Sequence, residues 1–161
     1  TNIIDPKKQI QQVGVDLTIS KINQINGGVI STDGKVINEY IKIEPISEID
    51  KDGKERFYYH LEPLKAYAVS FNEDCKIPND AMGRLIHKST LIRIGAQIVS
   101  AIFDPGFYSV DGMGSIFFTT CSIKIEKNAS ICQMYFHENT PVEDDQLYNG
   151  NYQGVKDIKA S

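Results

Sequence analysis

The sequence predicts an all-β fold, either a sandwich or a barrel, and two observations lead to this prediction. The first is that turn signals recur at short intervals along most of the chain: NGG at 26–28, DG at 33–34, 52–53 and 111–112, PND at 78–80, DPG at 104–106, KN at 127–128 and NG at 149–150. The second is that the residues between them are rich in β-branched and aromatic side chains, which favour strands. Short strands at such regular spacing are typical of sandwiches and barrels.

Six of the runs between turns are predicted strands, and they cover residues 35–43, 56–63, 65–73, 96–104, 115–126 and 130–138. The predicted helices are few and short. In the segment 5–12, Asp5 is placed to cap a helix and Pro6 to occupy its first position, so one or two helical turns are expected. The segment 141–161 has few apolar residues and is rich in Asp, Asn, Gln and Gly, and we interpret it as a mobile arm.

A second short helix is predicted within HKSTLIRIG, at residues 87–95. Ser89 is a residue type that caps helix N-termini, three apolar residues give the turn a buried side, and Gly95 suits the left-handed position that ends a helix. A helix this short is not stable in isolation, so tertiary packing must hold it in place.

The polar residues of this helix allow two interpretations. Lys88, Ser89 and Thr90 stand at its N-terminus, and Arg93 follows one turn later. A helix N-terminus with cations and hydroxyls around it can hold phosphate groups. The alternative is a capped connector between strands, with its cations in solvent.

The composition narrows the possible functions. The 161 residues suffice for one domain, and the net charge of −4 argues against a general binder of nucleic acids or membrane surfaces. No apolar run approaches the length of a membrane span, and the first residues lack a signal-peptide core. Cys75, Cys121 and Cys132 show no CxxC spacing, which predicts free, buried thiols in a reducing compartment and therefore a cytoplasmic protein.

Two carboxylates are candidate functional groups. Asp16 lies inside an apolar run at 13–19, where it either pairs with a cation, sits beside a metal-bound substrate, or faces water at the edge of a strand. Asp104 ends a predicted strand and precedes a Pro-Gly turn and Phe107. It is either the cap of that turn or a general base beside an aromatic ring that packs on a substrate.

Five segments, taken in order, resemble the motifs of the dUTPase and dCTP deaminase superfamily. VGVDL at 13–17 resembles AGxDL, and KSTLIRIG at 88–95 resembles RSSLxRxG. AIFDPGF at 101–107 resembles the third motif, xxIDPGW, and NASICQMYF at 128–136 resembles the fourth, xxRIxQLxF. YNGNYQG at 148–154 is similar to the C-terminal KYQGQxG of the deaminase branch. The order and spacing of the five segments are more specific than any one of them.

The resemblance implies a distorted jelly-roll of the dUTPase-like β-clip type, with one or two very short helices. It implies a β domain at 1–140 and an arm at 141–161 that closes over the active site. It also implies a homotrimer with active sites at subunit interfaces and a deoxynucleoside triphosphate substrate. Mg²⁺ would be bound to that substrate, held mainly by phosphates and water rather than by protein groups. Neither nucleic acid nor a membrane is expected as a partner.

The deaminases of this family use a Glu on the strand that follows the third motif. Here that position falls on Gly114 or Ser115, and the segment 114–122 contains no acidic residue. Because Asp104 of the third motif is present, the resemblance favours a dUTP diphosphatase that produces dUMP and pyrophosphate. Two alternatives stay open: a dCTP deaminase, alone or bifunctional, that uses a displaced acid such as Asp111, and a non-catalytic nucleotide-binding homologue.

The resemblance also assigns roles to individual residues. Asp104 would be the catalytic base, and the uracil would be read by backbone groups around 115–120. The residues expected to bind substrate are Lys88, Ser89, Thr90, Arg93, Phe107, Gln133, Tyr152 and Gln153, and those expected to shape the motifs are Gly14, Asp16, Gly106 and Gly154.

Three of these assignments have plain alternatives: Phe107 as a core aromatic, Gln133 as a polar residue on a strand face, and Tyr152 as an anchor of the tail. The chain departs from the family pattern at Lys88, where Arg is usual, and at Asn151 and Val155, where Lys and Gln are usual. These departures bear on how tightly a triphosphate is held, because Lys lacks the bidentate fork of Arg.

Overall fold

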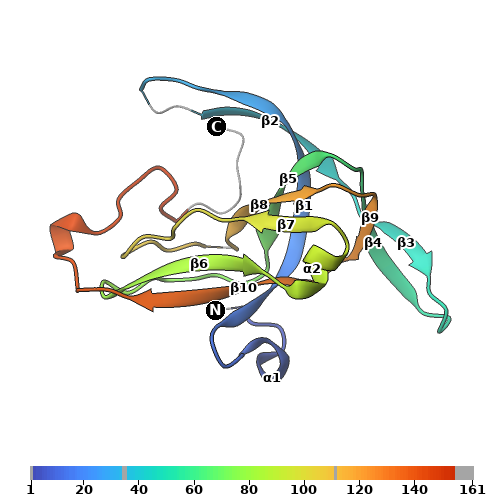
Figure 1. Cartoon of the computed structure of the whole chain (residues 1–161), viewed down its shortest axis with the longest axis horizontal. Helices are drawn as coiled ribbons and strands as arrows, with labels where there is room; N and C mark the ends of the chain where they lie inside the picture. Colours follow the sequence, from blue (N-terminus) through green and yellow to red (C-terminus); the bar gives the residue numbers. More distant parts are fainter. Residues whose placement is uncertain (1, 34–35, 111, 155–161) are drawn as a thin grey trace.

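Ten strands form two antiparallel sheets in the computed structural model, which describes residues 2–33, 36–110 and 112–154 (Figure 1). The larger sheet has the order β6-β10-β1-β5-β8-β7, with β2 also paired to β1, and the smaller has the order β3-β4-β9. The elements are α1 (Pro6–Gln9), β1 (Val15–Ile30), β2 (Val36–Ile43), β3 (Ile46–Ile49), β4 (Glu55–Leu61), β5 (Lys65–Phe71), β6 (Ala81–His87), α2 (Ser89–Arg93), β7 (Ala96–Val99), β8 (Gly114–Thr119), β9 (Ile123–Glu126), β10 (Ser130–Glu138) and the 3₁₀ turn η1 (Asp144–Gln146). The predicted all-β class with very short helices is confirmed.

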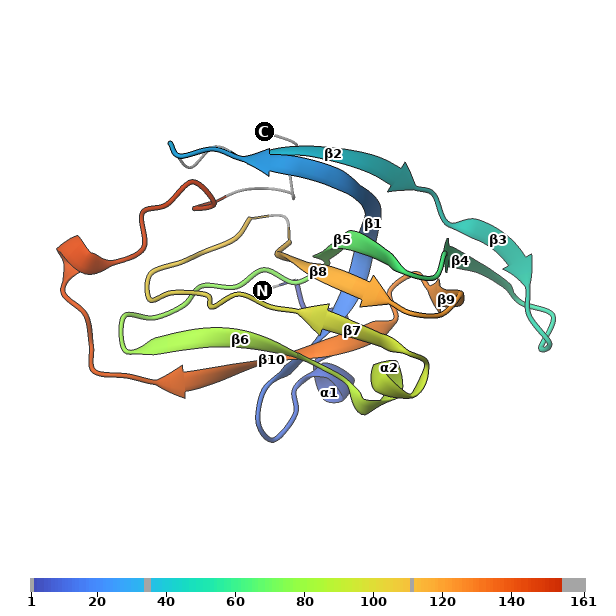
Figure 2. The ribbon, with the colours of Figure 1, turned by 45° about the horizontal axis from the view of Figure 1, so that its top comes forward.

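Strand β1 connects the two parts of the larger sheet. Its first residues, Val15–Thr18, pair with β10, and its later residues pair with β5 and β2. The register shifts at Leu17/Thr18 and again between Ile19 and Lys21, and such bulges bend a strand. Figure 2 shows β1 rising from the side of β10 to the ribbon that it forms with β2. The start of β1, which carries Asp16, is therefore fixed against β10.

The predicted strands match the structure except at two runs. The run 96–104 forms a strand only at Ala96–Val99, which is β7. Residues 115–126 form two strands, β8 and β9, which belong to different sheets. The turn between them is held by the Thr119 hydroxyl, which donates a hydrogen bond to the Cys121 carbonyl. Three strands were not predicted as such: β3, β6 and the full length of β1. In β6 every second side chain is buried, but glycine and a charged residue interrupt its apolar pattern.

Both short helices are present. Pro6 occupies the first position of α1 as predicted, and the Asp5 carboxylate pairs with Lys8 at 2.9 Å rather than capping the helix. In α2 the prediction that Ser89 is the N-cap is wrong: Lys88 is the N-cap, Ser89 is the first helical residue, and no side chain caps the turn. Gly95 has φ +77°, the left-handed conformation expected at a helix end.

The core lies between the strands of the larger sheet and the inner face of β4 and β9. Its largest fully buried side chains are Tyr67, Phe71, Phe117, Ile19, Ile22 and Leu61. The three cysteines are free, but the predicted burial is correct only for Cys132, since Cys121 is exposed and Cys75 half-buried. Among the described residues, no helix is both long and apolar enough to cross a membrane.

A buried carboxylate connects three segments near the start of β1. Glu73, only 2% exposed, follows β5 and accepts hydrogen bonds from the Thr18 backbone N–H at 2.9 Å, the Thr18 hydroxyl at 2.7 Å and the Gln9 carboxamide at 2.6 Å. The Gln9 carboxamide also donates to the carbonyl of Asp16 at 2.9 Å. Helix α1 and the Glu73 segment thus hold the strand that carries Asp16.

Glu73→Gln should destabilise the protein. The NH₂ group of the new amide would face the three groups of Gln9 and Thr18 that donate hydrogen bonds to this carboxylate, and it would find no acceptor among them. We expect a loss of roughly 1–3 kcal/mol, the cost of a buried polar group left without a partner. Urea unfolding of this variant and of Glu62→Gln, an exposed control, measures it. Equal unfolding midpoints for both variants would show that the Glu73 contacts contribute nothing.

Candidate active site

A polar cavity of about 290 Å³ opens where β1, β6, β10 and the start of α2 meet. Its lining residues are Gln11, Asp16, Ile86, His87, Lys88, Ser89 and Gln133. The strand register explains their proximity, since Asp16 stands opposite Gln133 and Gln133 stands opposite Ile86. The structure thus brings together residues from the first, second and fourth of the segments that the sequence singled out.

An ion pair forms the back of this cavity. The Lys88 ammonium lies 2.5 Å from the Asp16 carboxylate, and the two side chains are 35% and 7% exposed. The Gln133 carboxamide donates to the other Asp16 oxygen at 3.2 Å, and Lys88 also reaches the Ser130 hydroxyl at 3.3 Å. Of the three interpretations of Asp16, the pairing with a cation is therefore the one observed. One-third of Lys88 stays open to a ligand.

Gly14 allows the close approach that builds the ion pair. A Cβ atom at this position would overlap the carbonyl oxygen of Met134 and crowd the side chain of Gln133. Only a glycine therefore lets the start of β1 lie directly against β10. The expectation that Gly14 shapes its motif has this physical basis.

The polar residues of α2 differ in whether they line the cavity. Ser89 lines it, whereas Thr90 and Arg93 are exposed and do not. Gln11 and His87 line the cavity and were not predicted. His87 could have been suspected from its place directly before Lys88, but Gln11 lies in a turn whose position depends on α1 and on a bond from its backbone N–H to the Gly14 carbonyl.

Asp104 lies in a different part of the chain's surface. It is exposed and opens a tight turn, which the Phe107 N–H closes by donating to the Asp104 carbonyl at 3.0 Å, with Gly106 at φ +85°. The preceding residue, Phe103, pairs with Gly83 of β6, and Lys88 follows Gly83 by five positions. Along a strand this amounts to roughly 16 Å. Within one chain, the acid and the Lys88 cavity are therefore apart.

Phe107 is packed within its own chain. Its half-buried ring lies 5.3 Å from the ring of Phe103 and 5.6 Å from that of Tyr148, and it contacts the core. This environment favours the interpretation of Phe107 as a core aromatic.

The segment expected to read the base, 115–120, lies mostly within the larger sheet. From Ile116 to Thr119, β8 is paired on one edge with β5 and on the other with β7. Its backbone groups are thus engaged in the sheet and are not available to a base. This pairing argues against the expectation for this stretch.

The tail returns to the Asp104 turn. The Tyr148 N–H donates to the Pro105 carbonyl at 2.9 Å, and the Gln153 carboxamide bonds to the backbone of Gly106 and Tyr108. Tyr152 is 59% exposed. Gln153 therefore contacts protein backbone rather than presenting a free amide, whereas Tyr152 presents its ring to solvent. Val155, a departure from the family pattern, and Asp111, the displaced acid of the deaminase alternative, lie outside the described residues.

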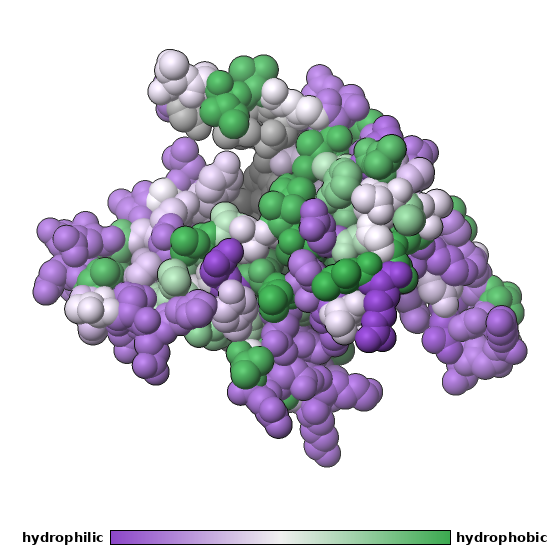
Figure 3. All heavy atoms as spheres, viewed as in Figure 1, coloured by the Kyte–Doolittle hydropathy of each residue, from purple (hydrophilic) through white to green (hydrophobic). Residues whose placement is uncertain are grey.

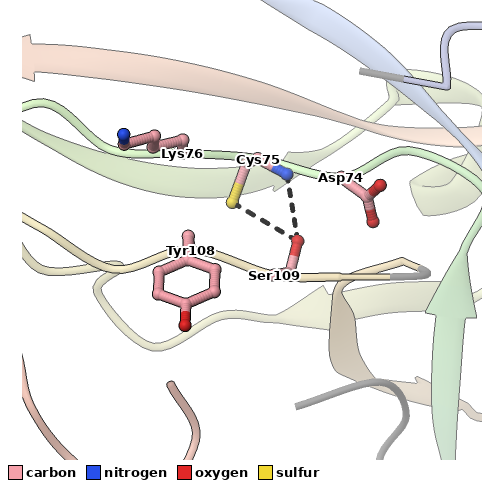
Figure 4. A pocket seen from close by; sticks show the side chains of 5 residues that line it. All are labelled: Asp74, Cys75, Lys76, Tyr108 and Ser109. Carbon is pink, nitrogen blue, oxygen red and sulfur yellow. Dashed lines mark hydrogen bonds between the residues drawn. The ribbon is translucent and has the colours of Figure 1, made fainter. Parts of the chain in front are cut away.

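A second cavity, of about 320 Å³, lies beside the same turn (Figure 4). It is lined by Asp74, Cys75, Lys76, Tyr108 and Ser109. The Ser109 hydroxyl accepts from the Cys75 N–H at 3.0 Å and donates to the Cys75 sulfur at 3.9 Å. Burial raises the pKa of the Cys75 thiol to about 11. The thiol is thus protonated near neutral pH and is not an activated nucleophile.

The sequence model of the dCTP deaminase-like family matches residues 2–139. The chain belongs to this family. It is 34% identical to a probable deoxyuridine 5′-triphosphate nucleotidohydrolase of Methanosarcina mazei over 94% of this chain and 85% of that protein. It is also 34% identical to the deoxyuridine 5′-triphosphate nucleotidohydrolase of Methanocaldococcus jannaschii, over 92% of this chain and 89% of that protein.

The fold has a counterpart among solved structures. The dCTP deaminase of Agrobacterium tumefaciens superimposes with a TM-score of 0.58 at 12% identity, over 83% of this chain and 41% of that one. This likeness concerns the fold. The superfamily to which the five motifs pointed is confirmed by the family match and by the archaeal relatives.

The pairing of Lys88 with Asp16 predicts that their substitutions are not additive. Lys88→Met leaves a buried carboxylate without its cation, whereas in the double variant with Asp16→Asn that charge is gone. We expect a coupling of roughly 0.5–3 kcal/mol in a double-mutant cycle of urea unfolding. Additive losses would mean that the ion pair does not contribute to the fold, and Lys127→Met serves as the exposed control.

Proposed function

We propose that the protein is a dUTP diphosphatase, which hydrolyses dUTP to dUMP and pyrophosphate. The observation that carries the proposal is the contrast between two acid positions. Asp104 is present and exposed on a tight turn, whereas the segment 114–122, where the deaminases carry their Glu, has no acid. At Ser115 the hydroxyl donates to the Val99 carbonyl at 2.9 Å, so it serves the sheet. The archaeal relatives with dUTP nucleotidohydrolase names support the same conclusion.

In the proposed reaction, water attacks the α-phosphorus of dUTP and the bond to the oxygen that bridges the α- and β-phosphates breaks. Asp104 takes the proton of the attacking water, and a positioned general base contributes roughly 10²–10⁴-fold to such a step. Lys88, Ser89 and Gln133 of the cavity bind phosphate oxygens, and the exposed Thr90 and Arg93 of α2 stand beside them. The ring of Tyr152, which is 59% exposed, closes over the nucleotide.

A metal ion is expected to enter the site bound to the substrate. Among the described residues, the His, Cys, Asp and Glu side chains form no group of three or more that could hold an ion by itself. Asp16 is the carboxylate in the cavity, and it is already shared by Lys88 and Gln133. Mg²⁺ bound to phosphate oxygens and water would neutralise the charge that develops on them.

The separation of Asp104 from the Lys88 cavity supports a homotrimer with its sites between subunits. One nucleotide must touch both groups, because the attacking water and the phosphorus have to meet at about 3–3.5 Å. A neighbouring copy can supply the acid to the cavity of the first. Ile86, which lines that cavity, is 49% exposed, and Ile92 and Ile94 at the end of α2 are 60% and 41% exposed. Figure 3 shows apolar surface on the face that carries β7 and α2. Such surface suits an interface between copies.

The free cysteines support a reducing compartment, where deoxynucleoside triphosphates are made and consumed, and we propose the cytoplasm. Deamination of dCTP is the alternative activity of the family. It would require an acid near Gly114, and Asp111 is the nearest in sequence.

Product analysis tests the assignment. We expect purified protein with Mg²⁺ to convert dUTP to dUMP and pyrophosphate, and to leave dCTP unchanged, as followed by ion-exchange chromatography. Asp104→Asn should lower kcat by roughly 10²-fold or more while nucleotide binding survives. Asp80→Asn, an exposed acid at another turn, is the matched control. Formation of dUTP or dUMP from dCTP, or a fully active Asp104→Asn, would contradict the proposal.

A further inference from the structure

The C-terminal tail is fitted closely to the turn that carries Asp104. The Gly154 N–H donates to the Tyr108 carbonyl at 3.0 Å, and the Tyr148 N–H donates to the Pro105 carbonyl at 2.9 Å. The ring of Tyr148 also packs against Phe107. Backbone bonds and a ring contact thus join residues 148–154 to residues 105–108 of the same chain.

Two glycines make this fit possible, one in each segment. A Cβ on Gly106 would lie 2.8 Å from the Cβ of Leu147, and a Cβ on Gly154 would lie 2.9 Å from the ring of Tyr108. Both glycines have positive φ, +85° and +65°, which other residues rarely adopt. The turn and the tail are therefore complementary in shape, in the conformation observed.

The Gln153 carboxamide is the polar centre of this contact. Its oxygen accepts from the Tyr108 N–H at 3.0 Å, and its nitrogen donates to the Gly106 carbonyl at 2.9 Å and to the Tyr148 carbonyl at 3.1 Å. Three of the hydrogen bonds that a carboxamide can make are thus used on backbone groups, and both of its donors are occupied. A substrate could form hydrogen bonds with the Gln153 amide only if the contact between the tail and the turn were broken.

We propose that Gln153 is a positioning residue, which holds the Asp104 turn of its own chain in the geometry that catalysis needs. The inference rests on the proposed role of Asp104 as the base. Asp104 itself is exposed, and its turn is closed by the Phe107 N–H to Asp104 carbonyl bond. The two Gln153 bonds to Gly106 and Tyr108 connect this turn to the tail. Gln153 therefore acts through Asp104 and does not bind the nucleotide.

This role has a kinetic signature. A misplaced base slows the chemical step, and displacements of about 1 Å can cost roughly 10²-fold in rate. The phosphate-binding cavity at Lys88 does not involve Gln153. Loss of the carboxamide should therefore lower kcat and leave KM nearly unchanged, whereas a substrate-binding glutamine would raise KM.

The test compares Gln153→Ala and Gln153→Glu with Gln146→Ala, an exposed glutamine of the same tail. Steady-state hydrolysis of dUTP is measured for all three and for the unmodified chain. We expect kcat to fall by roughly 10- to 100-fold in both Gln153 variants, with KM within about threefold, and no change in Gln146→Ala. The Glu variant keeps the length of the side chain but loses the two donors.

Hydrogen exchange provides a readout that does not depend on activity. The Tyr108 amide loses its acceptor in Gln153→Ala, so its exchange should accelerate by roughly fivefold or more relative to the unmodified chain and to Gln146→Ala. Unchanged exchange, unchanged kcat, or a raised KM at constant kcat would each overturn the proposal. Absence of dUTP hydrolysis by the unmodified chain would instead refute the proposed function, while the exchange of Tyr108 would still report whether Gln153 holds the turn.

Discussion

The approach of β1 to β10 is the constraint on which the candidate site depends. Gly14 lets the two backbones meet, and the register then places Asp16 opposite Gln133. Asp16 is buried, so its charge needs partners, and Lys88 and Gln133 provide them. The same ion pair fixes the N-terminus of α2, a helix too short to form without tertiary contacts.

The cost of a buried charge also explains the polar groups behind the cavity. Gln9 and Glu73 bind the backbone and side chains of β1 around Asp16, and both are almost fully buried. These contacts link α1, the segment after β5 and the first motif into one polar network. The position of the Asp16 carboxylate is thus determined by residues far away in sequence. Through Asp16, they also determine the position of Lys88.

Local patterns predicted the class of the fold and much of the site, but not how its parts are arranged. Alternating β-branched runs were sufficient to place β2, β4, β5 and β10. They could not show that 115–126 divides between two sheets, because that turn depends on a Thr119 hydroxyl bond. The motif pattern predicted Lys88, Ser89 and Gln133 together, and the structure places them in one cavity. Gln9, Gln11 and Glu73 gave no local signal, since their roles arise from tertiary contacts alone.

Asp104 and the Lys88 cavity lie apart on one chain. This separation leads to the central claim, that each active site is completed by two copies. Co-expression of Asp104→Asn and Lys88→Ala chains with different affinity tags, followed by purification through both tags, tests it. Each variant alone should be nearly inactive, and the mixed trimer should recover about one third of the unmodified activity, since one of its three sites then combines an intact acid with an intact cavity. A purified mixed oligomer without recovered activity would contradict the account.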